Sequence, residues 1–122
     1  MRILALDLAR KTGWALGTVN DKVPESGSVT IASEGASMAK LFSNWRLYLR
    51  DFLVMHPDIR TVVFEAPLPP MMKTGTTNIT TIRRLMGLCA VTEELLFTLD
   101  RYDVREARVA DVRNHFIGSN RH

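Results

Sequence analysis

The first strand of the chain constrains the fold more than any other stretch, because it is apolar on both of its faces. Between Ile3 and Leu8 every residue except Asp7 is apolar, so residues 2–8 are predicted to form a strand buried within a sheet. An ionised carboxylate in such a strand is costly unless another group pairs with it. Asp7 is therefore expected to have a partner that offsets its negative charge.

The rest of the chain alternates strand and helix patterns in a definite order. Lys11, Thr12 and Gly13 are expected to make a tight turn, and three strands on short connections predict an antiparallel meander. Pro57 is expected to end the first helix and Asn78 to cap the second. The expected strands are 2–8, 14–19, 27–32, 60–66 and 102–107, and the expected helices are 36–55, 78–99 and 109–117. The order β-β-β-α-β-α-β-α predicts an α/β fold with a mixed five-stranded sheet and helices on both faces.

The composition is that of one globular domain of 122 residues. Hydrophobic residues make up 46% and charged residues 24%, which excludes a disordered chain. The net charge of +3 and the pI near 9.4 are compatible with nucleic-acid binding. Cys89, the single cysteine, lies in an apolar helical pattern that predicts a core thiol in a reducing compartment. No apolar run approaches the ~20 residues of a membrane span and no signal peptide opens the chain, so we expect a cytoplasmic protein.

Asp7 has a counterpart in Glu65, because each ends an apolar strand just before a break in the pattern. If these two strands are parallel neighbours, both carboxylates emerge at the same edge of the sheet. Two anions so close repel each other unless one is protonated or a cation joins them, and carboxylate oxygens favour Mg²⁺ or Mn²⁺. Each residue taken alone is as readily a turn cap or an arginine partner. The pair in this topology favours a metal site.

Four segments resemble, in order, the motifs of the RuvC-like Holliday-junction resolvases, which have the ribonuclease H-like fold. "LALDLARKTGWAL" and "TVVFEAP" resemble the family's first two motifs, in which an aspartate and a glutamate end the first and fourth strands. "NITTIRRLMGL" and "VREARVADVRNHFIG" resemble, more weakly, the helix and the strand-to-helix segment that follow. The likeness runs over nearly the whole chain, and phage and bacterial small resolvases are the most similar.

The resemblance implies a chemistry for the two carboxylates. Such enzymes hydrolyse DNA phosphodiesters with two divalent ions, one activating water and the other stabilising the leaving 3′ oxygen. Asp7 would bridge both ions and Glu65 would hold one of them. The family works as a homodimer on four-way DNA junctions, because a junction needs two symmetric cuts. Both the DNA partner and the homodimer are therefore expected here.

The chain departs from the family's pattern at its C-terminus. The family adds one or two acidic ligands on a late helix, whereas this sequence stops at "GSNRH". Asp111 does not lie in such a motif, and Asp103 and Glu106 are expected in solvent or paired with Arg105 and Arg108 rather than as ligands. Either the chain is a C-terminally truncated fragment or it is a natural short form. In both cases we expect weak nuclease activity or none.

Basic and apolar side chains near the carboxylates are candidates for DNA contact. Met71 and Met72 are apolar in an expected loop, so they are predicted either to wedge between bases or to pack within the protein or against a partner. The basic candidates are also open to interpretation as solvated surface charge. They are Arg10, Lys11, Lys73, Arg83 and Arg84.

Two other function classes compete with the junction-resolving nuclease. A non-catalytic DNA-binding or scaffold domain of the same fold would explain the missing acidic ligand. A fragment of the actin-like ATP-binding fold shares the β-β-β-α start and an Asp-turn-Gly phosphate motif. Against the second, Ala9 and Arg10 stand where that motif usually has glycine.

Overall fold

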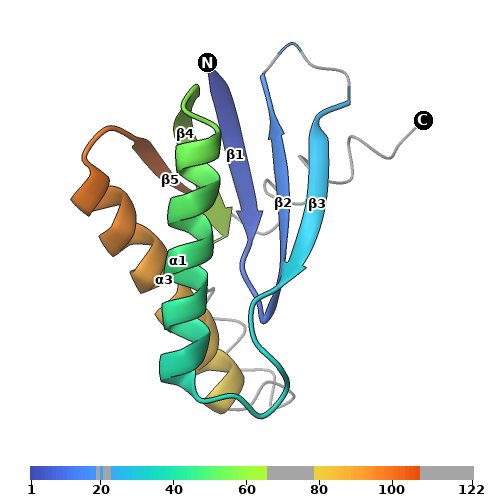
Figure 1. Cartoon of the computed structure of the whole chain (residues 1–122), viewed down its shortest axis with the longest axis vertical. Helices are drawn as coiled ribbons and strands as arrows, with labels where there is room; N and C mark the ends of the chain where they lie inside the picture. The colour runs from blue at the N-terminus through green and yellow to red at the C-terminus, as the bar shows by residue number, and fades with distance from the viewer. Residues whose placement is uncertain (19, 21–22, 66–78, 108–122) are drawn as a thin grey trace.

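The computed structural model describes residues 1–18, 20, 23–65 and 79–107, and these form a five-stranded mixed sheet with two helices (Figure 1). The short helix expected at 109–117 and the cap expected at Asn78 lie outside the described residues. The elements are β1 Arg2–Asp7, β2 Lys11–Gly17, β3 Glu25–Thr30, α1 Met38–Met55, β4 Ile59–Glu65, α3 Ile79–Leu99 and β5 Asp103–Ala107.

The strands lie in the order β3-β2-β1-β4-β5. The first three form the expected antiparallel meander, and β1 pairs in parallel with β4, which pairs in parallel with β5. Each parallel connection passes through a helix, as parallel neighbours require. The predicted mixed sheet is therefore confirmed, with β1 at its centre.

The turn expected at Lys11–Gly13 is wrong, because these residues already belong to β2. The chain reverses at Leu8–Arg10 instead. The buried hydroxyl Oγ1 of Thr12 donates to the carbonyl of Ala9 at 2.6 Å and accepts from its backbone N–H at 3.2 Å. A side chain thus satisfies the backbone groups of the turn, which lets pairing with β1 begin at Gly13.

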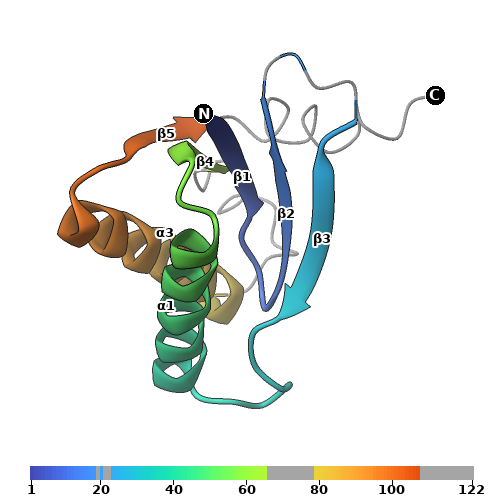
Figure 2. The ribbon, with the colours of Figure 1, turned by 45° about the horizontal axis from the view of Figure 1, so that its top comes forward.

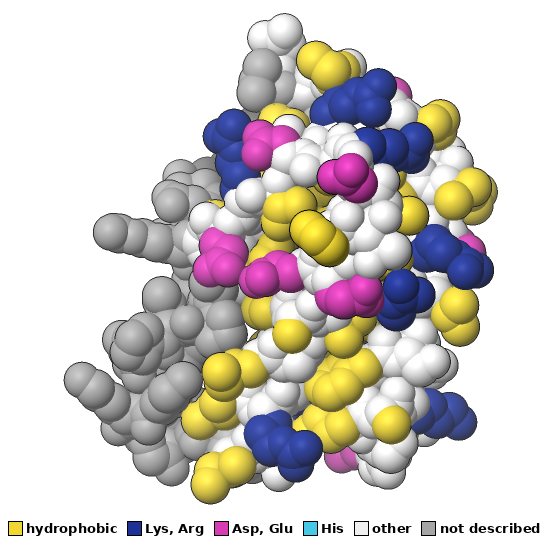
Figure 3. Space-filling view, turned by 90° about the vertical axis from the view of Figure 1, so that its left-hand side faces the viewer, with side chains coloured by type: hydrophobic (Ala, Val, Ile, Leu, Met, Phe, Trp, Pro, Cys, Tyr) yellow, Lys and Arg dark blue, Asp and Glu magenta, His cyan; other side chains and the backbone are white. Residues whose placement is uncertain are grey.

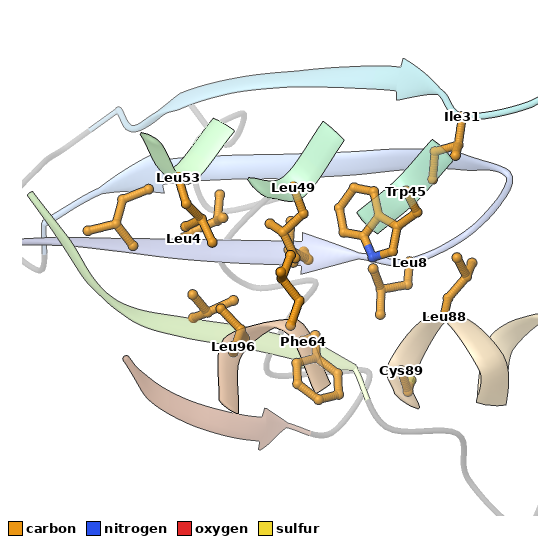
Figure 4. Close-up of a cluster of buried hydrophobic side chains, with 14 of the residues drawn as sticks. Leu4, Leu8, Ile31, Trp45, Leu49, Leu53, Phe64, Leu88, Cys89 and Leu96 are labelled. Carbon is orange, nitrogen blue, oxygen red and sulfur yellow. The ribbon is translucent and has the colours of Figure 1, made fainter. Parts of the chain in front are cut away.

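Both described helices pack on the same face of the sheet, where they lie side by side (Figure 2). The core between the helices and the sheet contains Leu8 and side chains from α1, α3, β1 and β4. Figure 4 shows, among others, Leu4, Leu8, Trp45, Leu49, Leu53, Phe64, Leu88 and Leu96. The expectation of helices on both faces depended on 109–117, so the described part of the chain has its helices on one face. We call the other face of the sheet the open face.

The two helices are joined by polar as well as apolar contacts. The buried indole N–H of Trp45 donates to Thr92 Oγ1 at 2.9 Å, so the largest core side chain leaves no unpaired donor. At the surface, Arg46 Nε contacts Glu94 Oε1 at 3.1 Å. These contacts set the position of α3 relative to α1.

Candidate metal centre

Asp7 and Glu65 lie at adjacent positions on neighbouring parallel strands. The β1–β4 register pairs Leu6 with Phe64, and each carboxylate is the next residue along its strand. Leu6 and Phe64 are buried against the helices, so strand alternation directs Asp7 and Glu65 to the open face. The predicted parallel pairing of the two strands is confirmed, and it places both residues at one end of the sheet.

The expected burial of Asp7 is wrong, since its side chain is exposed while Glu65 is half-buried. The reason is its place as the last residue of β1, on the open face. Gly13 stands opposite it in β2, and a Cβ there would lie 3.8 Å from the Asp7 Cβ. The absence of a side chain at this position leaves one flank of the Asp7 carboxylate accessible.

Asp7 and Glu65 have the donor chemistry that a hard divalent ion prefers. Mg²⁺ and Mn²⁺ take carboxylate oxygens, and Mg²⁺ in particular is usually held by one or two carboxylates together with substrate phosphate and water. The half-exposed position of the pair leaves room for those further ligands. Within the described residues, no group of three or more His, Cys, Asp or Glu side chains is placed to hold a metal ion. A third protein ligand is therefore not supplied by this part of the chain.

The remaining acidic residues near β5 lie away from the pair, as expected. Asp103 accepts from Arg105 at 2.8 Å, and it pairs in register with Thr61, four residues before Glu65. That spacing amounts to about 13 Å along the strand. Glu106 pairs with Phe64 in register and so faces the helices. Asp111 and Arg108 lie outside the described residues.

A carboxyl pair between α3 and β5 was not foreseen from the sequence. Glu93 and Glu106 share a side-chain hydrogen bond, and burial, this bond and the charge of Glu106 together raise the pKa of Glu93. The two residues border a groove of about 400 Å³ with Phe64, Phe97 and Tyr102. No sequence signal predicts this contact, because it depends on which face of β5 meets α3.

Of the two basic residues beside Asp7, one is engaged within the fold and one is exposed. Arg10 is half-buried, and its Nη1 donates to the carbonyl of Ala32 at 3.0 Å, which ties the turn to the segment after β3. Lys11 is exposed at the start of β2. It stands two residues before Gly13, so strand alternation directs it to the open face together with Asp7.

Arg83 and Arg84 lie near the beginning of α3, the first exposed and the second half-buried. Further along this helix, Cys89 Sγ lies 3.5 Å from the backbone oxygen of Glu65. The helix therefore passes the end of β4, and its basic first turns lie at the same end of the sheet as the carboxylates. Met71, Met72 and Lys73 lie outside the described residues.

Cys89 is a core thiol, as predicted. It is buried, and burial, followed by the charges of Glu106, Glu93 and Glu65, raises its pKa to about 11. A thiol so rarely ionised is neither a nucleophile nor a metal ligand at neutral pH.

Neither described helix is long and apolar enough to cross a membrane.

No protein-family model matches the chain, and no curated protein matches it. Solved structures do. RuvC of Thermus thermophilus in complex with a Holliday junction substrate matches with a TM-score of 0.72 at 9% identity, over 93% of this chain and 68% of that one. A second structure of Thermus thermophilus RuvC matches with a TM-score of 0.69 at 11% identity, over 100% of this chain and 72% of that one.

This chain has the ribonuclease H-like fold of RuvC. The resemblance to RuvC-like resolvases that the four motifs indicated is thereby confirmed at the level of the fold. The likeness covers the meander, the parallel strands and both described helices.

Proposed function

We propose that the chain is the core of a structure-selective DNA endonuclease that resolves four-way junctions by divalent-metal-dependent hydrolysis of phosphodiesters. The observation that carries the proposal is the placement of Asp7 and Glu65 at adjacent positions on the open face. The similar RuvC that is in complex with a Holliday junction substrate supports branched DNA as the ligand. The proposal includes two copies acting together and the cytoplasm as their place of action.

In the proposed reaction each residue has a role that follows from its position. Asp7 and Glu65 would hold Mg²⁺ or Mn²⁺, and the metal would supply an activated water and stabilisation of the leaving 3′ oxygen. Lys11, on the same face, neutralises a phosphate of the bound strand. Arg10 has a positioning role, because its bond to Ala32 holds the turn that follows Asp7.

A non-catalytic junction-binding domain is the second candidate. It is favoured by one observation: within the described residues, no third acidic side chain joins Asp7 and Glu65 in a group that could hold a metal ion. Two-metal hydrolysis needs more ligands than two side chains provide. On this ground we expect the 122-residue chain to cleave weakly or not at all while still binding junctions and metal.

The test combines metal binding with junction binding and cleavage. Mn²⁺ binding is measured by calorimetry, and a labelled four-way junction and a matching linear duplex are each incubated with the chain in Mn²⁺ or EDTA. Asp7→Asn is expected to weaken Mn²⁺ binding at least tenfold, because it removes a charged ligand from a two-carboxylate site. Asp103→Asn is the matched control on the same face and should bind Mn²⁺ as the original chain does.

The outcomes separate the candidates. Symmetric nicking of the junction that Asp7→Asn abolishes would support the nuclease. Junction-selective binding with no cleavage at any metal concentration would support the non-catalytic domain. Equal affinity for junction and duplex would contradict both, and ATP binding in the same calorimeter would revive the actin-like alternative.

A further inference from the structure

A short buried segment after β3 holds the turn that follows Asp7. It consists of Ile31 and Ala32, which we call the linking segment, and both belong to the core in which Figure 4 shows Ile31 and Trp45. The N–H of Ile31 donates to the carbonyl of Arg10 at 2.8 Å, and Nη1 of Arg10 donates to the carbonyl of Ala32 at 3.0 Å. The linking segment therefore fixes Arg10 through both its backbone and its side chain.

Asn44 joins the linking segment to α1. Its Nδ2 donates to the carbonyl of Ile31 at 3.0 Å, and its side chain is half-buried. The β2–β3 pairing ends with Lys11 and Thr30, so the carbonyl of Ile31 lies beyond the last pair of the ladder. A carbonyl of a buried residue that loses its donor is costly. Without Asn44 the linking segment would be more stable with this carbonyl turned toward water, and its hold on Arg10 would weaken.

The residues between Asp7 and Arg10 are also held, so a shift of Arg10 reaches the carboxylate. The side chain of Leu8 is buried in the core. Oγ1 of Thr12 donates to the carbonyl of Ala9 and accepts from its N–H. A ligand side chain has to stay within about 0.5 Å of its working position, and surrounding bonds and packing keep it there. The turn is the part of the fold that does this for Asp7.

We propose that Asn44 is a positioning residue of the candidate metal centre, although it lies on α1 and its hydrogen bond goes to Ile31 rather than to a carboxylate. It acts through the linking segment on Arg10, and through Arg10 on the turn that carries Asp7. Lys11 follows Arg10 directly, so the same contacts set the place of this cation on the open face. The inference rests on the proposed function for the identity of the ion, whereas the hold on the turn is measured without metal.

Arg46 provides a matched comparison on the same helix. It is two residues from Asn44, about 200° around the helix, and its Nε contacts Glu94 of α3 at 3.1 Å. Figure 3 shows the molecule from the side of α3 and β5, where charged side chains of both signs lie at the surface. Arg46→Met therefore removes a polar contact of α1 and leaves the linking segment intact.

Amide hydrogen exchange in the absence of metal tests the hold of Asn44 on the turn. Asn44→Leu keeps the size of the side chain but cannot donate, so the N–H of Ala9 is expected to exchange about threefold faster relative to that of Ala5, in the middle of β1. Arg46→Met should leave this ratio unchanged. A loss of global stability alone speeds both amides alike. An unchanged ratio in Asn44→Leu would therefore overturn the proposal.

Mn²⁺ affinity, measured from the electron paramagnetic resonance signal of the free ion, tests the effect on the metal centre. Asn44→Leu is expected to weaken binding about threefold, less than the about tenfold or more for a residue that bonds a metal ligand directly. Arg46→Met should bind Mn²⁺ as the original chain does, and an equal loss in both variants would overturn the proposal.

Thr12→Val tests the route, because it removes the bonds to Ala9 in the same turn. Combined with Asn44→Leu, it is expected to weaken Mn²⁺ binding by less than the product of the two separate effects, since both act on one turn. Effects that multiply would show that Asn44 does not act through the turn. An original chain that binds no Mn²⁺ would contradict the proposed metal centre, while the exchange of Ala9 still decides whether Asn44 holds the turn.

Discussion

At the scale of single residues, contacts between distant parts of the chain determine which acidic side chains lower the stability of the fold. Glu93 and Glu106 come from different elements and meet as neighbouring carboxyl groups. A pKa raised in the folded state means that the contact favours the protonated form. Its contribution to stability is present below the ordinary pKa of glutamate and is lost as the pH rises through the raised pKa. At neutral pH the pair is therefore a like-charge contact that works against folding.

Glu93→Gln is expected to stabilise the protein at pH 7, because it removes one charge and keeps a side chain that can donate to Glu106. The gain should be about 0.2–0.5 kcal/mol, as for other exposed like-charge neighbours. Urea unfolding at pH 7 and at pH 4 provides the measurement, and the gain should shrink at the lower pH. Glu34→Gln, in an exposed loop, is the control. A lower urea midpoint for Glu93→Gln at pH 7 would contradict this account of the pair.

At the scale of elements, α1 shows how local chemistry sets the ends of a helix. Ser37 is extended and its hydroxyl accepts from the backbone N–H of Lys40 at 3.1 Å, so the helix begins at Met38. Pro57 was expected to stop it, and the helix ends at Met55 with His56 as its cap. Both ends therefore follow from side chains and backbone within a few residues of them.

Ser37→Ala is expected to cost about 1 kcal/mol of folding free energy, since the cap bond is lost. Ser43→Ala makes the same substitution at an exposed position inside the helix. There alanine is the better helix former, so stability should be unchanged or slightly higher. Urea denaturation of the two variants side by side measures the difference. Equal effects of the two would show that Ser37 does not act as a cap.

At the scale of the whole molecule, a contact between residues far apart in the sequence joins the starts of β1 and β4. Arg2 begins β1, and its Nη2 donates to Asp58 Oδ1 at 2.7 Å, just before β4. This hydrogen bond is the main reason that the pKa of Asp58 is lowered. A lowered pKa contributes stability above the ordinary value of 3.8, and that contribution is lost as the pH falls below it.

Asp58→Asn is therefore expected to lower the urea midpoint at pH 7 and to lose its effect as the pH falls through 4 toward 3. Asp51→Asn is the comparison, because Asp51 pairs only with its chain neighbour Arg50 among the ion pairs of the described residues. It should change the midpoint little at either pH. An Asp58→Asn effect that is as large at pH 3 as at pH 7 would mean that the contact with Arg2 is not its cause.

The sequence by itself was sufficient for the order of the strands and helices among the described residues. Strand β1 is apolar on both faces and helix α1 has an apolar stripe, and these periodicities are local properties of the chain. The sequence placed Asp7 and Glu65 at one edge on the condition that their strands are parallel neighbours, and the pairing of β1 with β4 meets that condition. The ribonuclease H-like fold of RuvC was predicted from the same motifs and is confirmed.

Only the tertiary structure decided which groups face one another. It directed Glu106 to Glu93 and Arg10 to the carbonyl of Ala32, and it left Asp7 exposed instead of buried. It also left Ile79, Met86 and Phe97 of α3 exposed. Hydrophobic periodicity indicates that a helix or strand has an apolar side. Which of its residues then meet the sheet depends on how all the elements pack together.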